Sequence, residues 1–477
     1  MSPGTSRDDD LLPKTDGRAR EHLGFSRASW MRAGREGAVV AAGQLAVAVA
    51  GLVGIRLLTE LAPREVFGEA NLLLGVVQLG RLILVAPFIS AQVRFHPEYV
   101  IRGQARWFTR EISRLTWLGS ALFALLGLVA YSTWRWNDGG GYRPMMLAAL
   151  AAYFFVDTAR AIKINRLVAE RRRALTAWWQ GTEHWLTVFV PATALLLTAT
   201  TTSYLVGFAV GTALVYPVFG GWLDPPLVDR EDGTPEPRKE FSRRMFRYGL
   251  PFVPLALCGW LSSLADRYVI AGFLGTADAG LYVAAYSVAS RPFLMVGAVF
   301  TNFARPILFQ AESSGDARRG RQVFALWLAT TATVCALGVL GFAFLGDWVA
   351  KLLLAPAYRE GSVALFVWIG LGHAMYVIVQ VIESRLMSLE RSRRLVVPSV
   401  SAAVANLGVS IALVPALGAL GSGITKAIAF GMHLLFISVA LLRARRGSPG
   451  GPASGARFGQ QNHVVEKEFP GAGSDVD

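Results

Sequence analysis

Charged residues interrupt several long apolar stretches of the chain. Asp266, Arg267 and Arg291 lie within the stretch from Phe246 to Leu308, and Arg81 lies within an earlier one. A charged side chain at the centre of a bilayer costs about 2.5–3.5 kcal/mol on insertion scales, so it must face water, a partner or a ligand. Guanidinium groups stay protonated and bind phosphate oxygens in pairs. These residues therefore predict a cavity that binds an anionic, phosphate-bearing group, with structural pairing to carboxylates as the alternative.

Two pairs of charged residues have both a structural and a functional interpretation. Asp157 and Arg160 are three residues apart, so on a helix they share a face and can neutralise each other. We interpret them as a structural pair at a cavity wall, with ion binding or gating as the alternative. Asp266 and Arg267 are adjacent and must point to different faces. Arg267 could add to a cationic cavity, and Asp266 could bind a cation or pair with Arg56, but a structural gate pair is equally compatible.

Three further charged residues lie near the ends of predicted membrane spans. Glu383 and Arg385 are near the inner end of one span, and Lys426 is near the outer end of another. Long charged side chains in such places can reach the membrane interface. We expect interfacial roles for all three residues and keep ion binding or gating as the alternative for Glu383.

Histidine and cysteine residues show no pattern typical of metal binding. His184, His373 and His433 have no ligand spacing, and Cys258 and Cys335 both lie inside predicted spans. No phosphate loop of the GxxxxGK[ST] kind is present. We therefore expect no metal, no cofactor, no disulfide and no enzymatic activity such as ATP hydrolysis.

The composition is that of a membrane protein. Of the 477 residues, 53% are hydrophobic and 17% are charged, whereas a soluble domain has about 25% charged residues. The net charge of +14 could suggest binding to nucleic acid. Most of the basic residues, however, lie in short segments between apolar runs, so we do not expect nucleic acid as a partner.

Apolar runs of sufficient length predict about twelve membrane-spanning helices in an all-α protein. Six lie in an N-lobe (38–222) and six in a C-lobe (246–443). The charged, proline-rich segment DPPLVDREDGTPEPRK opens a predicted cytoplasmic linker at 223–245. A basic cytoplasmic tail (1–37) and a disordered tail (444–477) are predicted at the two ends. The expected spans are 38–61, 67–92, 113–134, 142–164, 183–197, 203–222, the two helices of 246–308 on either side of a turn at 275–280, 322–345, 362–387, 395–415 and 421–442.

Basic residues are distributed unequally between the two sides of this topology. Arg residues are dense in the loops that follow the second, fourth, eighth and tenth spans and sparse in the alternate loops. Because cytoplasmic loops carry the excess of Lys and Arg, both termini are expected in the cytoplasm. The expected location is the bacterial inner membrane.

The two halves show a weak internal repeat. Phe67-Gly68 opens the second span as Ala279-Gly280 opens the eighth, and Arg81 and Arg291 lie at similar depths with a proline after each. Two related halves of six spans favour a transporter with its site near the membrane centre between them.

Several motifs resemble the Wzx-type polysaccharide flippases of the multidrug/oligosaccharidyl-lipid/polysaccharide (MOP) superfamily. The resemblance covers residues 36–445, and the middle of the chain carries its more specific part. The motifs are Arg247-Tyr248-Gly249-Leu250-Pro251, Ala265-Asp266-Arg267-Tyr268, Phe273-Leu274-Gly275, Gly280-Leu281-Tyr282, Ala285-Tyr286 and the run from Phe67-Gly68 to Gln92-Val93-Arg94-Phe95.

The resemblance implies two six-helix lobes in a V and alternating-access transport of undecaprenyl-diphosphate-linked oligosaccharide units. The related lipid II flippases have essential cavity arginines on the first, second and eighth spans. Arg81 matches the second of these positions, and Arg56 matches the first approximately. At the eighth-span position this chain has Ser287, with Arg291 one helical turn later. This departure favours a polysaccharide repeat unit over lipid II.

The expected partners are the lipid-linked oligosaccharide, membrane lipids, polysaccharide polymerases and glycosyltransferases. The main alternative is a drug/cation antiporter of the same superfamily, which should favour carboxylates over arginine within the membrane. A non-transporting scaffold of a polysaccharide assembly complex is the third class.

Overall fold

The computed structural model describes residues 43, 46–138, 144–223 and 236–446, and all regular structure within these ranges is helical. The predicted all-α fold class is confirmed. The predicted N-terminal tail (1–37), the start of the first span, most of the linker before residue 236 and the C-terminal tail from 447 lie outside the described residues.

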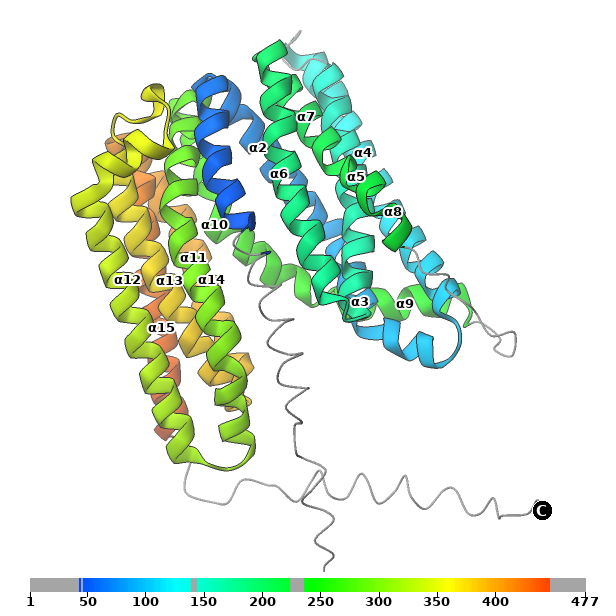
Figure 1. The fold of residues 1–477 in the computed structure, drawn as a ribbon, viewed down its shortest axis with the longest axis vertical. Helices are drawn as coiled ribbons and strands as arrows, with labels where there is room; N and C mark the ends of the chain where they lie inside the picture. Colours follow the sequence, from blue (N-terminus) through cyan, green and yellow to red (C-terminus); the bar gives the residue numbers. More distant parts are fainter. Residues whose placement is uncertain (1–42, 44–45, 139–143, 224–235, 447–477) are drawn as a thin grey trace, which may run out of the picture.

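The helices form two lobes (Figure 1). The N-lobe contains a first helix at 46–61 and the helices α2 (Arg64–Leu84), α3 (Ala86–Ile101), α4 (Ala105–Asp138), α5 (Pro144–Ala169), α6 (Arg173–Leu197), α7 (Thr201–Ala213) and α8 (Val215–Leu223). After α9 (Arg238–Gly249), the C-lobe contains α10 (Phe252–Leu274), α11 (Thr276–Ser313), α12 (Ala317–Leu353), the short η2 (Pro356–Tyr358), α13 (Ser362–Ser388), η3 (Ser392–Leu395), α14 (Val396–Leu417) and α15 (Ala419–Arg446).

The chain is a multi-pass membrane protein. Within the described ranges, nine helices are long and apolar enough to cross a bilayer, and a tenth counts if α9 and α10 are one bent span. The helix 46–61 and α6 occupy the remaining places in the predicted order of twelve. Large apolar side chains are exposed along these helices, including Leu128 on α4 and Phe344 on α12. Such exposure is expected where the solvent is lipid.

Several helix boundaries differ from the predictions for reasons that the backbone explains. The predicted second span breaks at Val85 between α2 and α3, which places Pro87 in a first helical turn, where its missing N–H is tolerated. The predicted sixth span breaks at Leu214 between α7 and α8. The turn expected at 275–280 is reduced to Gly275, whose φ of 96° suits glycine. The segment predicted as a linker up to residue 245 contains most of α9, which begins at Arg238.

The two lobes are in contact at one end of the molecule, where α2 crosses α11. A Cβ atom at Gly68 would lie 1.9 Å from the carbonyl oxygen of Thr276, and one at Gly280 would lie 2.1 Å from that of Arg64. Each glycine thus faces the carbonyl four residues before the other glycine. The missing side chains allow the two backbones to touch, and the reciprocal contacts agree with the internal repeat seen in the sequence at these two glycines.

The same end is closed by η2, which packs against the end of the first helix. The Tyr358 hydroxyl donates to the Ala62 carbonyl oxygen at 2.9 Å, and the Ala355 amide donates to the Thr59 hydroxyl at 3.3 Å. The Arg56 guanidinium also donates to the Leu354 carbonyl. We call this end, defined by the glycine crossing and these η2 contacts, the closed end.

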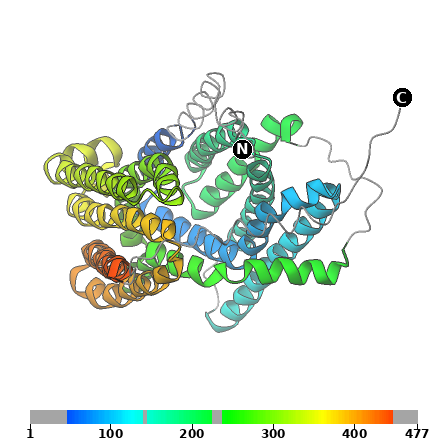
Figure 2. The ribbon, with the colours of Figure 1, turned by 90° about the horizontal axis from the view of Figure 1, so that it is seen from below.

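Towards the opposite end the lobes separate, and α9 joins them there (Figures 1 and 2). One face of α9 packs on α3, and its axis is bent by 43° from that of α10. Phe241 and Met245 of α9 are fully buried in an aromatic cluster with Tyr99 and Phe108. We call this end the open end.

Candidate functional site

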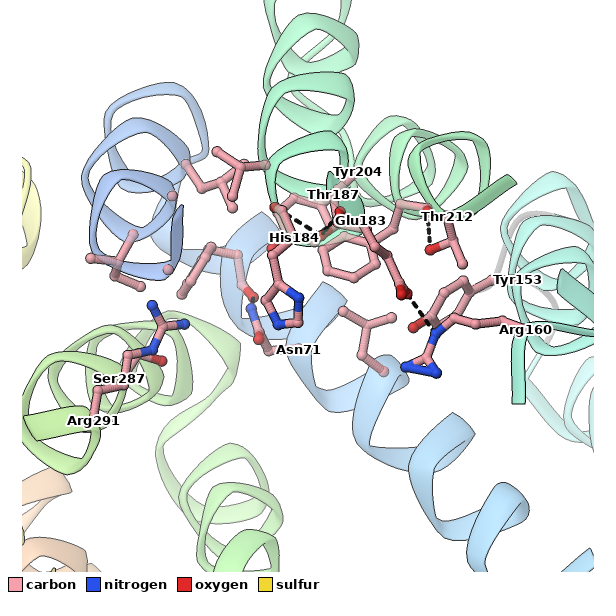
Figure 3. A pocket seen from close by; sticks show the side chains of 18 residues that line it. Asn71, Tyr153, Arg160, Glu183, His184, Thr187, Tyr204, Thr212, Ser287 and Arg291 are labelled. Carbon is pink, nitrogen blue, oxygen red and sulfur yellow. Dashed lines mark hydrogen bonds and ion pairs between the residues drawn. The ribbon is translucent and has the colours of Figure 1, made fainter. Parts of the chain in front are cut away.

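A cavity of about 270 Å³ lies between the lobes (Figure 3). Its volume is slightly below the range of about 300–1,000 Å³ that is usual for small-molecule sites. In this conformation it suits a head group rather than a whole oligosaccharide. The lining residues are Gly51, Gly54, Ile55 and Leu58 of the first helix, Phe67, Asn71 and Leu74 of α2, Tyr153 and Arg160 of α5, Glu183, His184, Thr187 and Val188 of α6, Tyr204, Phe208 and Thr212 of α7, and Ser287 and Arg291 of α11.

Arg291 and Ser287 are the C-lobe's contribution to this cavity. They are four residues apart on α11, so they share a helix face. The Arg291 guanidinium reaches the first helix, where a Cβ atom at Gly51 would lie 1.8 Å from its Nη1 atom. Nη1 is buried and has no hydrogen-bond partner among the described residues. Arg291 is therefore a cation held between the lobes without a carboxylate in the described structure.

The N-lobe wall holds a chain of four alternating charges. The Asp157 carboxylate lies between two arginines, 3.4 Å from Arg81 Nε and 3.4 Å from Arg160 Nε. Arg160 also pairs with Glu183 at 2.5 Å. The two arginines and two carboxylates balance, so this wall carries no net charge. Of the four, Arg160 and Glu183 line the cavity, whereas Arg81 and Asp157 do not.

Aromatic rings cover part of the N-lobe wall. Tyr204 stacks on Phe208 with ring centroids 5.7 Å apart, and Tyr153 meets Phe208 edge to face at the same distance. Phe67 meets Tyr204 edge to face at 6.2 Å. Together with Asn71 the rings present apolar faces beside a polar amide, a combination that suits a sugar ring with its apolar C–H faces and hydroxyl rims.

The structure brings together some of the predicted site residues and separates others. Arg291 and Ser287 line the cavity, and Arg160 joins them on the opposite wall (Figure 3). Arg81 is paired with Asp157, the structural alternative that we considered, and does not converge with Arg291 in this cavity. Arg56 lies near the closed end and pairs with Glu60 at 2.9 Å instead of with Asp266.

The remaining predicted residues lie inside the C-lobe. Asp266 and Lys426 form an ion pair at 3.0 Å, and both side chains are fully buried. The interfacial role expected for Lys426 is wrong, because Asp266 and the Ser262 carbonyl hold its ammonium inside the lobe. Arg267 lies over the Tyr286 ring, 4.9 Å from its centroid. Glu383 is 3.8 Å from the buried His433 and does not line the cavity.

Sequence reasoning missed several lining residues. Glu183 and His184 open the predicted fifth span, but α6 begins ten residues earlier, at Arg173, and carries them into the lobe. A carboxylate beside a histidine in an apolar helix is the signal that could have found them. Gly51 had no such signal, because its role depends on the approach of α11. Among the described residues no group of three or more His, Cys, Asp or Glu side chains could hold a metal ion.

Comparisons with solved structures agree with this architecture. The chain superposes on the lipid II flippase MurJ in an inward closed conformation with a TM-score of 0.62 and 13% identity, covering 91% of this chain and 93% of that one. It superposes equally well on an inward-facing multidrug resistance MATE family transporter of the MOP superfamily, with 14% identity over 84% of this chain and 96% of that one. The chain therefore shares the overall fold of these two proteins.

Two other comparisons add detail. A MOP superfamily transporter from Pyrococcus furiosus, whose title reports reverse polarity of its binding pocket, gives a TM-score of 0.52 at 12% identity, over 85% of this chain and 94% of that one. Residues 233–363 match the family described as polysaccharide biosynthesis protein. This match covers α9 and the C-lobe as far as the start of α13. No curated protein sequence matches the chain.

Proposed function

We propose that this protein is a flippase that moves an undecaprenyl-diphosphate-linked oligosaccharide unit across the inner membrane for polysaccharide export. The observation that carries the proposal is Arg291, an arginine in the cavity between the lobes that has no carboxylate partner in the part of the chain that the structure describes. An uncompensated guanidinium in a low-dielectric site favours an anionic group, and its planar fork matches phosphate. The matching polysaccharide biosynthesis family supports this class of substrate.

The division of charge in the cavity supports the same substrate. Because the charges of the N-lobe wall balance, Arg291 supplies the net field, and Ser287 adds a hydroxyl donor one turn away. A diphosphate would lie at this C-lobe side. The first sugar would then lie against Tyr204 and Phe208, where the aromatic faces are.

Transport would proceed by alternating access. By the positive-inside rule the open end would face the cytoplasm, so the substrate would enter between the separated lobes. Breaking the contacts of the closed end while the open end closes would expose the cavity to the outer side. At the closed end the lobes are joined by contacts between helix ends and between backbones, and a rigid-body movement of the two lobes can break these contacts together.

The test combines lipid binding with export. Arg291→Ala should leave the protein folded and inserted, remove the co-purified lipid-linked diphosphate seen by native mass spectrometry and abolish export of the polysaccharide. Arg291→Lys should retain part of the binding, because it keeps the charge and loses the fork. Arg318→Ala, an exposed arginine of α12 outside the cavity, is the control. Full export and unchanged lipid binding by a well-expressed Arg291→Ala variant would refute the proposal.

A drug/cation antiporter is the second candidate, because the carboxylate of Glu183 lines the cavity and a MATE transporter is among the similar structures. The ion pair with Arg160 counts against it, since that carboxylate is already neutralised. Binding of cationic drugs that Glu183→Gln abolishes, without any co-purified lipid diphosphate, would favour the antiporter.

A further inference from the structure

The exposed side of α9 carries three basic side chains that form a strip. Lys239, Arg243 and Arg247 follow one another at intervals of four residues, so they lie along one face of the helix, and all three are exposed. Their neighbours Arg238 and Arg244 are bound to Glu111 and Glu98. The three residues of the basic strip form no ion pair with any carboxylate of the described residues. Their charge is therefore available to a ligand.

The opposite side of α9 is fixed to the N-lobe, which determines where the basic strip points. Phe241 and Met245 are fully buried in the cluster beneath the helix. Arg244 Nη2 donates to both carboxylate oxygens of Glu98, each at 3.0 Å. A helix held by apolar burial and by a two-point ion pair cannot roll freely. The basic strip is thus presented outwards as a rigid surface and not as a loose tail.

The basic strip continues into exposed apolar surface. Phe246 and Leu250 at the end of α9 and Phe252 at the start of α10 are each about half exposed. From there α10 enters the C-lobe as an apolar helix after the 43° bend. Basic side chains followed by exposed aromatic and aliphatic side chains are typical of a helix at the level of lipid head groups. A soluble polyanion would match the charges and leave the apolar part uncovered.

We propose that the basic strip of α9 is a binding site for anionic phospholipid head groups of the leaflet at the open end. The ammonium and guanidinium groups would contact the phosphates, while Phe246, Leu250 and Phe252 would lie among the upper acyl chains. Because α9 joins the lobes beside the opening between them, such lipids would bind next to the route between the lobes. This role is separate from recognition of the transported substrate.

The experiment compares two triple variants of the full chain in nanodiscs of phosphatidylcholine mixed with phosphatidylglycerol. Lys239→Gln, Arg243→Gln and Arg247→Gln together remove the basic strip. Arg318→Gln, Arg319→Gln and Arg321→Gln remove the same charge from exposed positions at the start of α12 and are the matched control. Native mass spectrometry after partial delipidation measures the phosphatidylglycerol that each protein retains.

The basic-strip variant should lose affinity for phosphatidylglycerol by about fivefold for each basic residue removed, since one such residue near an anionic surface contributes about 1 kcal/mol. The control should retain the lipid. Equal loss in both variants, or no loss in the basic-strip variant, would overturn the proposal. The proposal would also be overturned if the basic-strip variant retained the lipid but lost binding of an RNA oligonucleotide. If the triple variant misfolds, Arg243→Lys with Arg247→Lys keeps the charge and must retain the lipid.

Discussion

Arg291 gives the cavity its net positive charge, because the other charged residues around the cavity are paired with one another. Arg81, Arg160 and Arg291 all lie within apolar helices, but only Arg291 lacks a carboxylate partner among the described residues. The groups that face a buried guanidinium thus decide whether it forms an ion pair between helices or keeps an unpaired charge. The glycine that faces it, Gly51, is part of the site in this sense although it has no side chain.

Substitution of Gly51 should disturb the site without disturbing the fold. In Gly51→Ala the new methyl group would occupy the space of Arg291 Nη1, and the flexible end of the arginine would move aside. A charge-assisted hydrogen bond contributes about 1.5–3 kcal/mol, so we expect at least about tenfold weaker binding of the lipid-linked diphosphate. Titration of the purified variant with that lipid measures the loss.

The control for this prediction is Gly181→Ala on α6. A Cβ atom there would meet only the Cβ of Ala46, at an ordinary contact distance of 3.7 Å. Both variants place alanine in a helix, which favours helix formation equally. Equal lipid affinity of the two variants would show that Gly51 does not position Arg291.

At the scale of helices, α9 is the element that departs most from the sequence prediction. Its basic residues and the proline-rich segment before it are typical of a linker, whereas its burial depends on α3 and α4, which are more than a hundred residues away in the chain. Glu98 of α3 forms the main polar contact, and the hydrogen bonds from Arg244 lower the pKa of this carboxyl group below its ordinary value. The docking of α9 should therefore respond to acid.

Because the folded-state pKa of Glu98 is lowered, its contribution to stability is present above the ordinary glutamate pKa of about 4.3. It is lost as the pH falls through the lowered folded-state value. We expect Glu98→Gln to lower the melting temperature at neutral pH and the difference from the unmodified protein to vanish in strong acid. Thermal unfolding in detergent across this pH range measures both. Glu240→Gln changes an exposed glutamate of α9 and is the control. Its difference in melting temperature from the unmodified protein should not depend on pH in this way. A pH-independent effect of Glu98→Gln would contradict the prediction.

The helical architecture follows from the sequence more completely than the site does. Runs of apolar residues are local, so the order of the spans and their division into two lobes could be predicted from them. The partners of charged residues can be close in the sequence or far away in it. Asp157 was expected to pair with Arg160, three residues away, and does so. The pairing of Asp266 with Lys426 joins α10 to α15 and required the folded C-lobe. For the same reason Ser287 and Arg291 could be placed on one face, but not Gly51 opposite them.

For the whole molecule, the balance between the two ends should decide which conformation is populated. The closed end depends on a few specific contacts, of which the hydrogen bond from Tyr358 to the Ala62 carbonyl is fully buried. Removing the donor leaves that carbonyl unsatisfied, at a cost of about 1–3 kcal/mol. Weakening this end should increase the population with the open end closed.

Tyr358→Phe tests this expectation, because it removes the hydroxyl and keeps the ring. Spin labels at Ile101 on the N-lobe and Ser314 on the C-lobe, both exposed, would report the separation of the lobes. We expect a shorter-distance population to grow by at least about fivefold relative to the unmodified protein. The conservative Tyr376→Phe, on α13 away from η2, serves as the control. An identical distance distribution in Tyr358→Phe would exclude this contact as part of the closure.

The glycine crossing at the closed end has the form of a symmetric interface. Gly68 and Gly280 make reciprocal contacts, each with the carbonyl oxygen four residues before the other. Such reciprocity defines an isologous interface, in which one patch meets its own copy across a two-fold axis. At this crossing the two lobes of the single chain therefore meet as the two subunits of a homodimer would. The symmetry of this crossing does not extend to the cavity, where the charges of the N-lobe wall are paired with one another and Arg291 of the C-lobe has no carboxylate partner among the described residues.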